Sequence, residues 1–96
     1  MRKLGEVIRY YRKKGRISQK ELAEQAGLSA NSMVGIELGR HVPSEEALNK
    51  ISKSLNIPIP VLLLSQIEEG DFKKEYRPLY KTMFVPFIDC MEGGPY

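Results

Sequence analysis

Apolar residues recur at helical spacing along the first part of the chain. The first set, Leu4, Val7, Ile8 and Tyr11, is in step over residues 3 to 14, and such spacing puts apolar side chains on one face of an α-helix. Gly15 follows directly and permits the helix to stop. We therefore expect a first helix over residues 3 to 14.

A second helix begins at a capping signal. Ser18 is followed three residues later by Glu21, the spacing at which each side chain satisfies a free backbone amide of the first turn. Gly27 is placed to end this helix after about two turns. The positions expected to face inward are Leu22, Ala23 and Ala26.

A third helix follows after a short turn. Ser29 is its cap candidate and Gly39 closes it. One side of this helix carries Met33, Ile36 and Glu37. A turn of about three residues with a glycine separates the second and third helices, which is the arrangement of a helix-turn-helix.

Two more helices are predicted before residue 70. Ser44 caps a fourth helix, and Asn56 is a plausible left-handed terminator for it. The stretch "IPIPVLLLSQIEE", residues 57–69, reads as a fifth helix, because prolines are tolerated in a first turn. The apolar positions are Leu48, Ile51 and Leu55 in the fourth helix and Leu62, Leu63 and Ile67 in the fifth.

The character of the sequence changes from Gly70 onward. A helical turn is expected before Pro78, whereas "TMFVPFIDCM" is rich in strand formers and is interrupted by Pro86, which favours an edge or extended position. This stretch is too apolar to be freely solvated, so we expect it to pack on the domain or on a second chain. The end, "EGGPY", is typical of a flexible tail. The chain thus divides into a domain over residues 1–69 and an extension over residues 70–96.

The composition suits one small globular domain. The 96 residues are 42% hydrophobic and 28% charged, enough for one core but not two. No window has the apolar length of a membrane span, and Glu6 and Arg9 interrupt any signal-peptide core, so we expect a cytoplasmic protein that does not bind membranes. One cysteine, Cys90, and one histidine, His41, supply no metal site and no catalytic set. We expect no metal, no cofactor and no enzymatic activity.

The positive charge is concentrated in the first part of the chain. Residues 1–40 hold nine Lys or Arg and four acids, a net of +5, and the remainder holds six and eight, a net of −2. A basic first part suits a polyanion such as DNA, although scattered lysines also occur on ordinary solvated helix faces. Charge alone leaves both interpretations open.

The stretch "ISQKELAEQAGLSANSMVGIELGRHVPSEEALNKISKSLNI" resembles the Xre-type family of helix-turn-helix repressors, which includes the lambdoid phage repressor and Cro proteins. The resemblance covers roughly residues 4 to 66. Its specific marks are Gln19 at the start of the second helix, "ELAEQAGLS", "IELG", Pro43 before a capped helix, and "SLNI". It implies an all-α fold, a compact five-helix domain that binds operator DNA as a homodimer with its third helix in the major groove.

The resemblance also implies the roles of individual residues. Free amides at the starts of the second and third helices can hold phosphates while side chains beyond them reach base edges. The implied base contacts are Ala30, Asn31, Val34 and Gly35. The implied phosphate contacts are Ser18, Gln19, Lys20, Ser29, Ser32, Arg40 and His41. Arg12 and Glu37 match a pair that in some relatives forms a structural salt bridge between the first and third helices.

The third helix departs from its relatives because it carries no Lys or Arg. Ala30, Val34 and Leu38 form an apolar ridge, with Asn31 and Gly35 as the neighbouring row. We expect Asn31 to read adenine and the ridge to touch thymine methyls, at a site rich in A and T. Helical geometry places Gly35 outward, where a missing side chain either lets the helix approach the bases or is without effect.

The sequence leaves alternatives open for function and for the extension. The apolar ridge and tail also suit a protein-interaction module, such as an antitoxin of a toxin pair. Residues 85–96, "VPFIDCMEGGPY", are similar to the segment that begins the carboxy-terminal domain of self-cleaving repressors of the SOS type. The extension is accordingly a dimer contact, a site for a protein partner, or the remnant of a larger domain.

Overall fold

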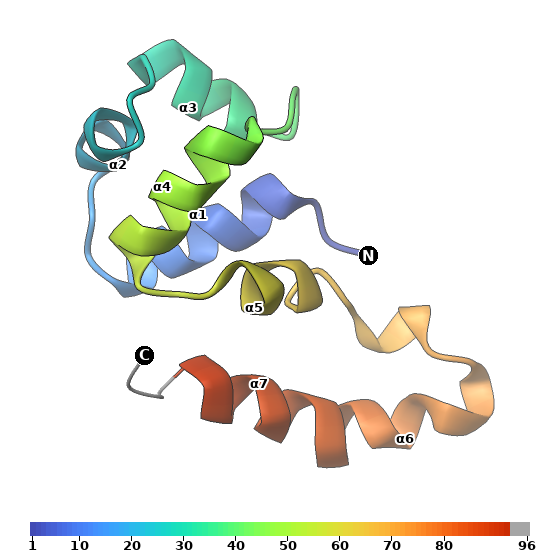
Figure 1. Cartoon of the computed structure of the whole chain (residues 1–96). Coiled ribbons are helices and arrows are strands. Elements are labelled where there is room, and N and C mark those ends of the chain that lie inside the picture. Colours follow the sequence, from blue (N-terminus) through green and yellow to red (C-terminus); the bar gives the residue numbers. More distant parts are fainter. Residues whose placement is uncertain (93–96) are drawn as a thin grey trace.

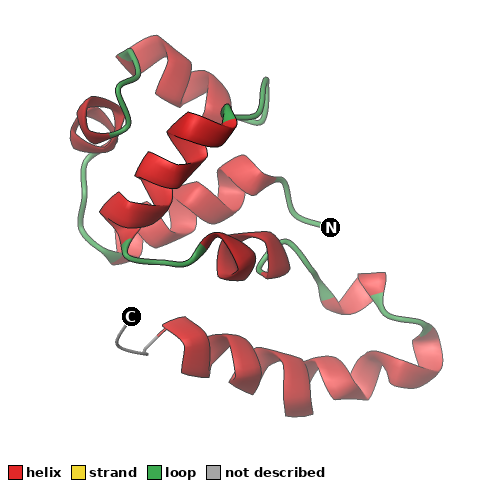
Figure 2. Ribbon diagram, viewed as in Figure 1, coloured by secondary structure: helices red, strands yellow, loops and turns green. Residues whose placement is uncertain are grey.

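Helices make up all the regular structure over residues 1–92, the part of the chain that the computed structural model describes. Figure 1 shows a bundle of helices with a longer helical arm beneath it, and Figure 2 shows only helices and loops in this part of the chain. The bundle consists of α1 (Leu4–Lys14), α2 (Gln19–Gln25), α3 (Ala30–Glu37), α4 (Glu45–Leu55) and α5 (Ile59–Leu64). The all-α prediction is confirmed.

Local signals in the sequence set the boundaries of the bundle helices. Ser18 and Glu21 form the expected capping box at α2, and the Ser29 and Ser44 side chains accept hydrogen bonds from backbone amides at the starts of α3 and α4. Asn56 has φ 57°, the predicted left-handed termination of α4. Caps of this kind satisfy amides that a helix leaves unpaired.

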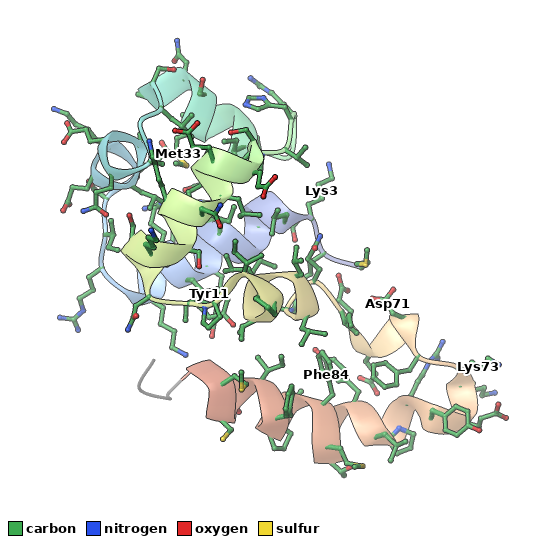
Figure 3. All side chains as sticks on the ribbon, in the orientation of Figure 1. Lys3, Tyr11, Met33, Asp71, Lys73 and Phe84 are labelled. Atoms are coloured by element: carbon green, nitrogen blue, oxygen red, sulfur yellow. The ribbon has the colours of Figure 1, made fainter. Side chains whose placement is uncertain are left out.

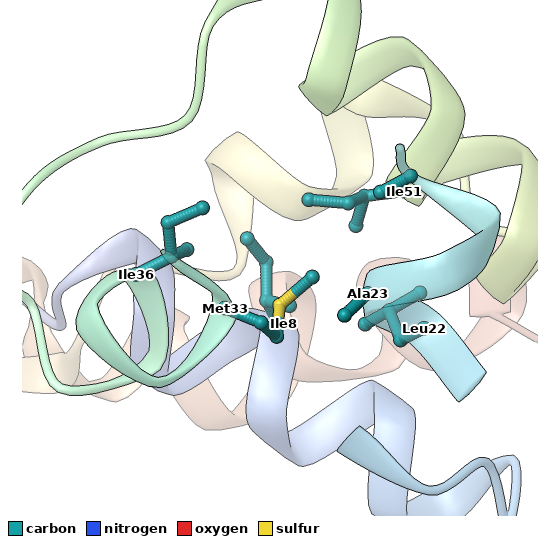
Figure 4. Close-up of a cluster of buried hydrophobic side chains, with 7 residues drawn as sticks. Ile8, Leu22, Ala23, Met33, Ile36 and Ile51 are labelled. Atoms are coloured by element: carbon teal, nitrogen blue, oxygen red, sulfur yellow. The ribbon is translucent and has the colours of Figure 1, made fainter. Parts of the chain in front are cut away.

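Two apolar clusters hold the bundle together, and partly buried Leu4 and Leu55 pack against both. Figure 4 shows the first cluster, in which α1, α2, α3 and α4 meet. Its buried members are Ile8, Leu22, Ala23, Ala26, Met33, Ile36 and Ile51. The second joins α1 to α5 through Val7, Tyr11, Ile57, Val61 and Leu62. This packing anchors α2 and α3 on α1.

The fifth helix is shorter than predicted. It spans Ile59–Leu64 rather than residues 57–69, and Leu63 is 46% exposed while Val61 and Leu62 are buried. The expectation that Leu63 belongs to the inward stripe is therefore wrong. The run of apolar residues conceals which of them face inward, because every position in it is apolar.

The extension is helical, so the expected extended conformation of residues 82–91 is wrong. Short turns η1 (Glu69–Asp71) and η2 (Lys74–Tyr76) lead into α6 (Arg77–Leu79), the π-helical η3 (Tyr80–Phe84) and α7 (Val85–Glu92). In η3 the Val85 amide donates to the Tyr80 carbonyl, five residues back. A wide turn of this kind accommodates a proline, here Pro86, that cannot donate to the preceding turn.

The helical arm packs on the bundle along one face. Ile88 is buried, and Met91 packs against the cluster shared by α1 and α5. Tyr11 and Phe84 lie on the two sides of this junction (Figure 3). Residues 93–96, within the predicted flexible tail, lie outside the described residues. No helix within residues 1–92 combines the length and apolar character needed to cross a bilayer.

Candidate nucleic-acid interface

The pair α2 and α3 forms a helix-turn-helix with capped helix starts. Gly27, at φ 70°, turns the chain between the two helices. The Ser18 Oγ accepts from the Glu21 amide at 3.0 Å, and the Ser29 Oγ accepts from the Ser32 amide at 3.1 Å. Both serines are exposed. Two helix starts, whose amides and partial positive charge favour anions, therefore reach the surface.

A buried ion pair holds α3 against α1. The Arg12 Nε donates to Glu37 Oε2 at 2.7 Å and its Nη2 donates to Oε1 at 3.0 Å. The side chains are 11% and 3% exposed. Arg12 also donates to the Ile17 carbonyl at 3.0 Å, and Gln19 donates its amide to Glu37 Oε1 at 3.2 Å. The predicted pair is present, and it also orients Gln19 at the start of α2.

One face of α3 is open to solvent. Ala30 and Asn31 are exposed, Val34 is half-buried, and Leu38, just after the helix, is 52% exposed. The apolar ridge predicted from the sequence is thus at the surface. Val42, in the loop after the helix, is a further exposed apolar side chain, at 76%. The sequence reasoning missed it, since helical spacing gives no signal beyond the end of a helix.

Gly35 is not the open position that helical geometry suggested. It is buried, and the imidazole of His41 covers it. A Cβ placed on Gly35 would lie 2.9 Å from Nδ1 of that ring, with Cε1 closer still. The outward placement follows from the helix alone, whereas the loop after α3 folds back over this position. A direct contact between Gly35 and a base stays a prediction and requires the ring to move.

Exposed basic side chains lie near both ends of the helix-turn-helix. Lys20 is exposed at the start of α2 and Arg40 after α3, and their contacts with phosphates stay a prediction. Lys3, which the sequence reasoning did not include, reaches Gly39, with its Nζ 3.2 Å from where a Cβ would stand. No local pattern around Lys3 could reveal this, since α1 and α3 come together only in the fold. Within residues 1–92 no cluster of His, Cys, Asp and Glu is arranged to hold a metal ion.

Comparisons with known proteins agree with this geometry. Residues 5–69 match the helix-turn-helix domain family, so the chain belongs to that family. It is a DNA-binding regulator, and the family is not enzymatic.

Two curated relatives give the family a regulatory context. The chain is 34% identical over 76 residues to the ImmF control region 10 kDa protein of Bacillus phage phi105. The aligned region covers 76% of this chain and 84% of that protein. The chain is 29% identical over 62 residues to an HTH-type transcriptional regulator of Methanocaldococcus jannaschii, covering 65% of this chain and 94% of that protein. No solved structure matches.

Proposed function

We propose that the protein is a sequence-specific repressor of the Xre type, which binds a palindromic operator as a dimer with α3 in the major groove. The observation that carries the proposal is the exposed face of α3. The buried pair of Arg12 and Glu37 fixes α3 on α1, and the starts of α2 and α3 are both capped. The similarity to a phage control-region protein favours repression.

The phosphate backbone is the first partner of this surface. Phosphate contacts set register and orientation, while base contacts supply sequence preference. The groups proposed for phosphates lie at the starts of α2 and α3 and just after α3: Ser18, Gln19, Lys20, Ser29, Ser32 and Arg40. Since α3 itself carries no basic residue, attraction to DNA comes from these flanking groups and from the first part of the chain.

Direct reading of bases falls to few side chains. Asn31, the second residue of α3, is exposed. Its side-chain amide can pair bidentately with adenine. Ala30 and Val34 offer methyl groups to thymine. These chemistries favour a site rich in A and T.

Selection of bound sites from a random DNA pool tests the proposal. We expect two inverted half-sites whose centres are about one helical turn apart, roughly 10 base pairs, as a two-fold symmetric dimer requires. A pool that shows no enriched sequence after repeated rounds would contradict sequence-specific binding.

The Asn31→Ala variant tests the assignment within the site. We expect it to lose about 1 to 3 kcal/mol of discrimination at one adenine position per half-site. Equal weakening on the operator and on every base-substituted operator, measured by titration of labelled duplex, would refute the assignment. Glu24→Ala, an exposed substitution on the neighbouring helix α2, is the matched control.

The extension is proposed to join two copies of the chain. Its helical run over residues 77–91 leaves large apolar side chains exposed: Leu79 at 41%, Met83 at 64% and Phe87 at 51%. These recur at intervals of four residues, so they form a stripe on the helical arm. Two-fold pairing through one such stripe on each copy would bury it.

A protein-interaction module, such as an antitoxin, is the second candidate. The same stripe of Leu79, Met83 and Phe87 favours it. Binding to duplex DNA separates the two, because phosphate neutralisation releases counterions and makes affinity fall with salt. An antitoxin that also represses its own operon would satisfy both.

A further inference from the structure

We propose that His41 is a specificity-determining residue whose imidazole reads a base edge in place of the side chain that α3 lacks at position 35. The inference rests on the proposed function and deepens it. The resemblance to Xre-type repressors assigns His41 to a phosphate; the structure supports a different role, because the ring lies on the recognition helix itself.

The ring occupies the space of a missing side chain. Built on Gly35, a Cβ would collide with Cε1 of His41 and would lie 2.9 Å from Nδ1 and 3.4 Å from Nε2. All three of its nearest neighbours therefore belong to one imidazole. His41 as a whole remains exposed although Gly35 beneath it is buried.

The loop after α3 brings the ring to this position. Gly39 takes φ 77°, a left-handed conformation that favours glycine. Its amide donates to the Ile36 carbonyl at 3.0 Å, and the Arg40 amide donates to the Gly35 carbonyl at 2.9 Å. These two bonds turn the chain back along α3. His41 follows Arg40 directly, so the backbone geometry itself directs the loop toward Gly35.

Position 35 belongs to the row of α3 that carries Asn31. Residues four apart lie on the same side of a helix, so the His41 ring extends the row begun by the exposed Asn31. A neutral imidazole offers one donor and one acceptor, and the major-groove edges of guanine and adenine present acceptors that it can meet. The row thus gains a second polar reader without a long side chain on α3.

The inference also accounts for a glycine inside the recognition helix. Glycine is unfavourable in a helix interior relative to alanine. Here a side chain at position 35 would displace the ring from the helix. Glycine at this position therefore allows the imidazole of His41 to lie against α3.

The test measures affinities of four proteins for the selected operator and for a panel with each base pair substituted in turn. We expect His41→Ala to lose about 5- to 150-fold of discrimination at one base pair per half-site, distinct from the Asn31 position. Gly35→Ala should lose discrimination at the same base pair, because its methyl group displaces the ring. The double variant should lose no more than either single one.

Folding and mechanism are separated by the design. Gly35→Ala adds a good helix former, so an unchanged or raised Tm shows that its loss of discrimination does not come from unfolding. Equal weakening of His41→Ala on all duplexes would mark a phosphate contact and overturn the inference while the proposed function stands. A wild-type chain that selects no sequence would overturn both.

Discussion

Arg16 adopts a left-handed backbone conformation that residues other than glycine and asparagine seldom take. Its φ is 57°, while Gly15 before it remains in the right-handed region at φ −80°. The predicted stop of α1 near Gly15 is correct, but the left-handed residue is the arginine. A left-handed conformation costs a side-chain-bearing residue roughly 1 to 2 kcal/mol.

Replacing Arg16 by glycine is therefore expected to stabilise the domain. The relief of strain exceeds the extra entropy that glycine loses on folding, leaving a gain of about 0.5 to 1 kcal/mol. Urea denaturation monitored by circular dichroism measures it. Arg16→Ala is the matched control and should show no such gain, because alanine keeps the Cβ that causes the strain. A Gly variant no more stable than the Ala variant would contradict the argument.

The buried pair of Arg12 and Glu37 stabilises the fold and is not expected to read bases. Glu37→Gln keeps the shape but leaves the Arg12 guanidinium buried beside a neutral amide. We expect a loss of about 3 to 5 kcal/mol in unfolding free energy. Glu46→Gln, which breaks an exposed pair with Lys50 at 3.4 Å, is the control and should cost less than about 0.5 kcal/mol.

Base preference provides a second readout for this pair. Under conditions in which Glu37→Gln is folded, its relative affinities across substituted operators should match the wild type, since neither residue of the pair lies on the exposed face of α3. A changed preference would show that the pair takes part in reading bases.

At the scale of elements, the sequence predicts helix boundaries best where residues at the helix ends cap or terminate the helix. Ser18, Ser29, Ser44 and Asn56 mark helix ends through local hydrogen bonds or backbone conformation, so α2, α3 and α4 follow from short windows. The arm lacks such marks. Pro86 and its apolar neighbours suggest an extended segment, and only the π-helical turn of η3 makes the helix acceptable.

In the candidate site too, features set by local sequence are predicted and features that depend on contacts between segments are not. The exposure of Asn31 and the pairing of Arg12 with Glu37 agree with sequence periodicity and motif matching. The covering of Gly35 by His41 and the approach of Lys3 to Gly39 arise from contacts between segments. Helical spacing describes one helix at a time, so it cannot predict that a following loop folds back over that helix.

Gly5 allows α1 and α3 to approach each other closely. A Cβ at Gly5 would collide with the Ile36 carbonyl oxygen and lie 3.0 Å from Glu37 Cα. Because these neighbours are backbone, they cannot rotate aside, and Gly5→Ala should destabilise the domain by at least about 1 to 3 kcal/mol. Gly70→Ala, with nothing within 4 Å of the added methyl, is the control and should be close to neutral. Equal Tm values for the two variants would contradict the close approach.

At the scale of the whole molecule, the proposed dimer depends on the stripe of Leu79, Met83 and Phe87. We expect Met83→Ser combined with Phe87→Ser to shift the chain toward monomer in sedimentation equilibrium, because the pairing loses apolar area. Lys81→Ser, exposed on the same arm, should leave the distribution unchanged. A wild-type chain that is monomeric at all concentrations, or a double variant that dimerises like the wild type, would contradict this role for the extension.

Sequence-specific binding of duplex DNA is the central claim for the whole molecule, and a salt titration on two duplexes tests it most directly. Fluorescence anisotropy would follow wild-type binding to the selected operator and to a scrambled duplex of the same composition. We expect affinity for both to fall steeply with salt. At each salt concentration the operator should be bound at least about 1,000-fold more tightly. Equal affinity for the two duplexes, or an affinity indifferent to salt, would contradict the account.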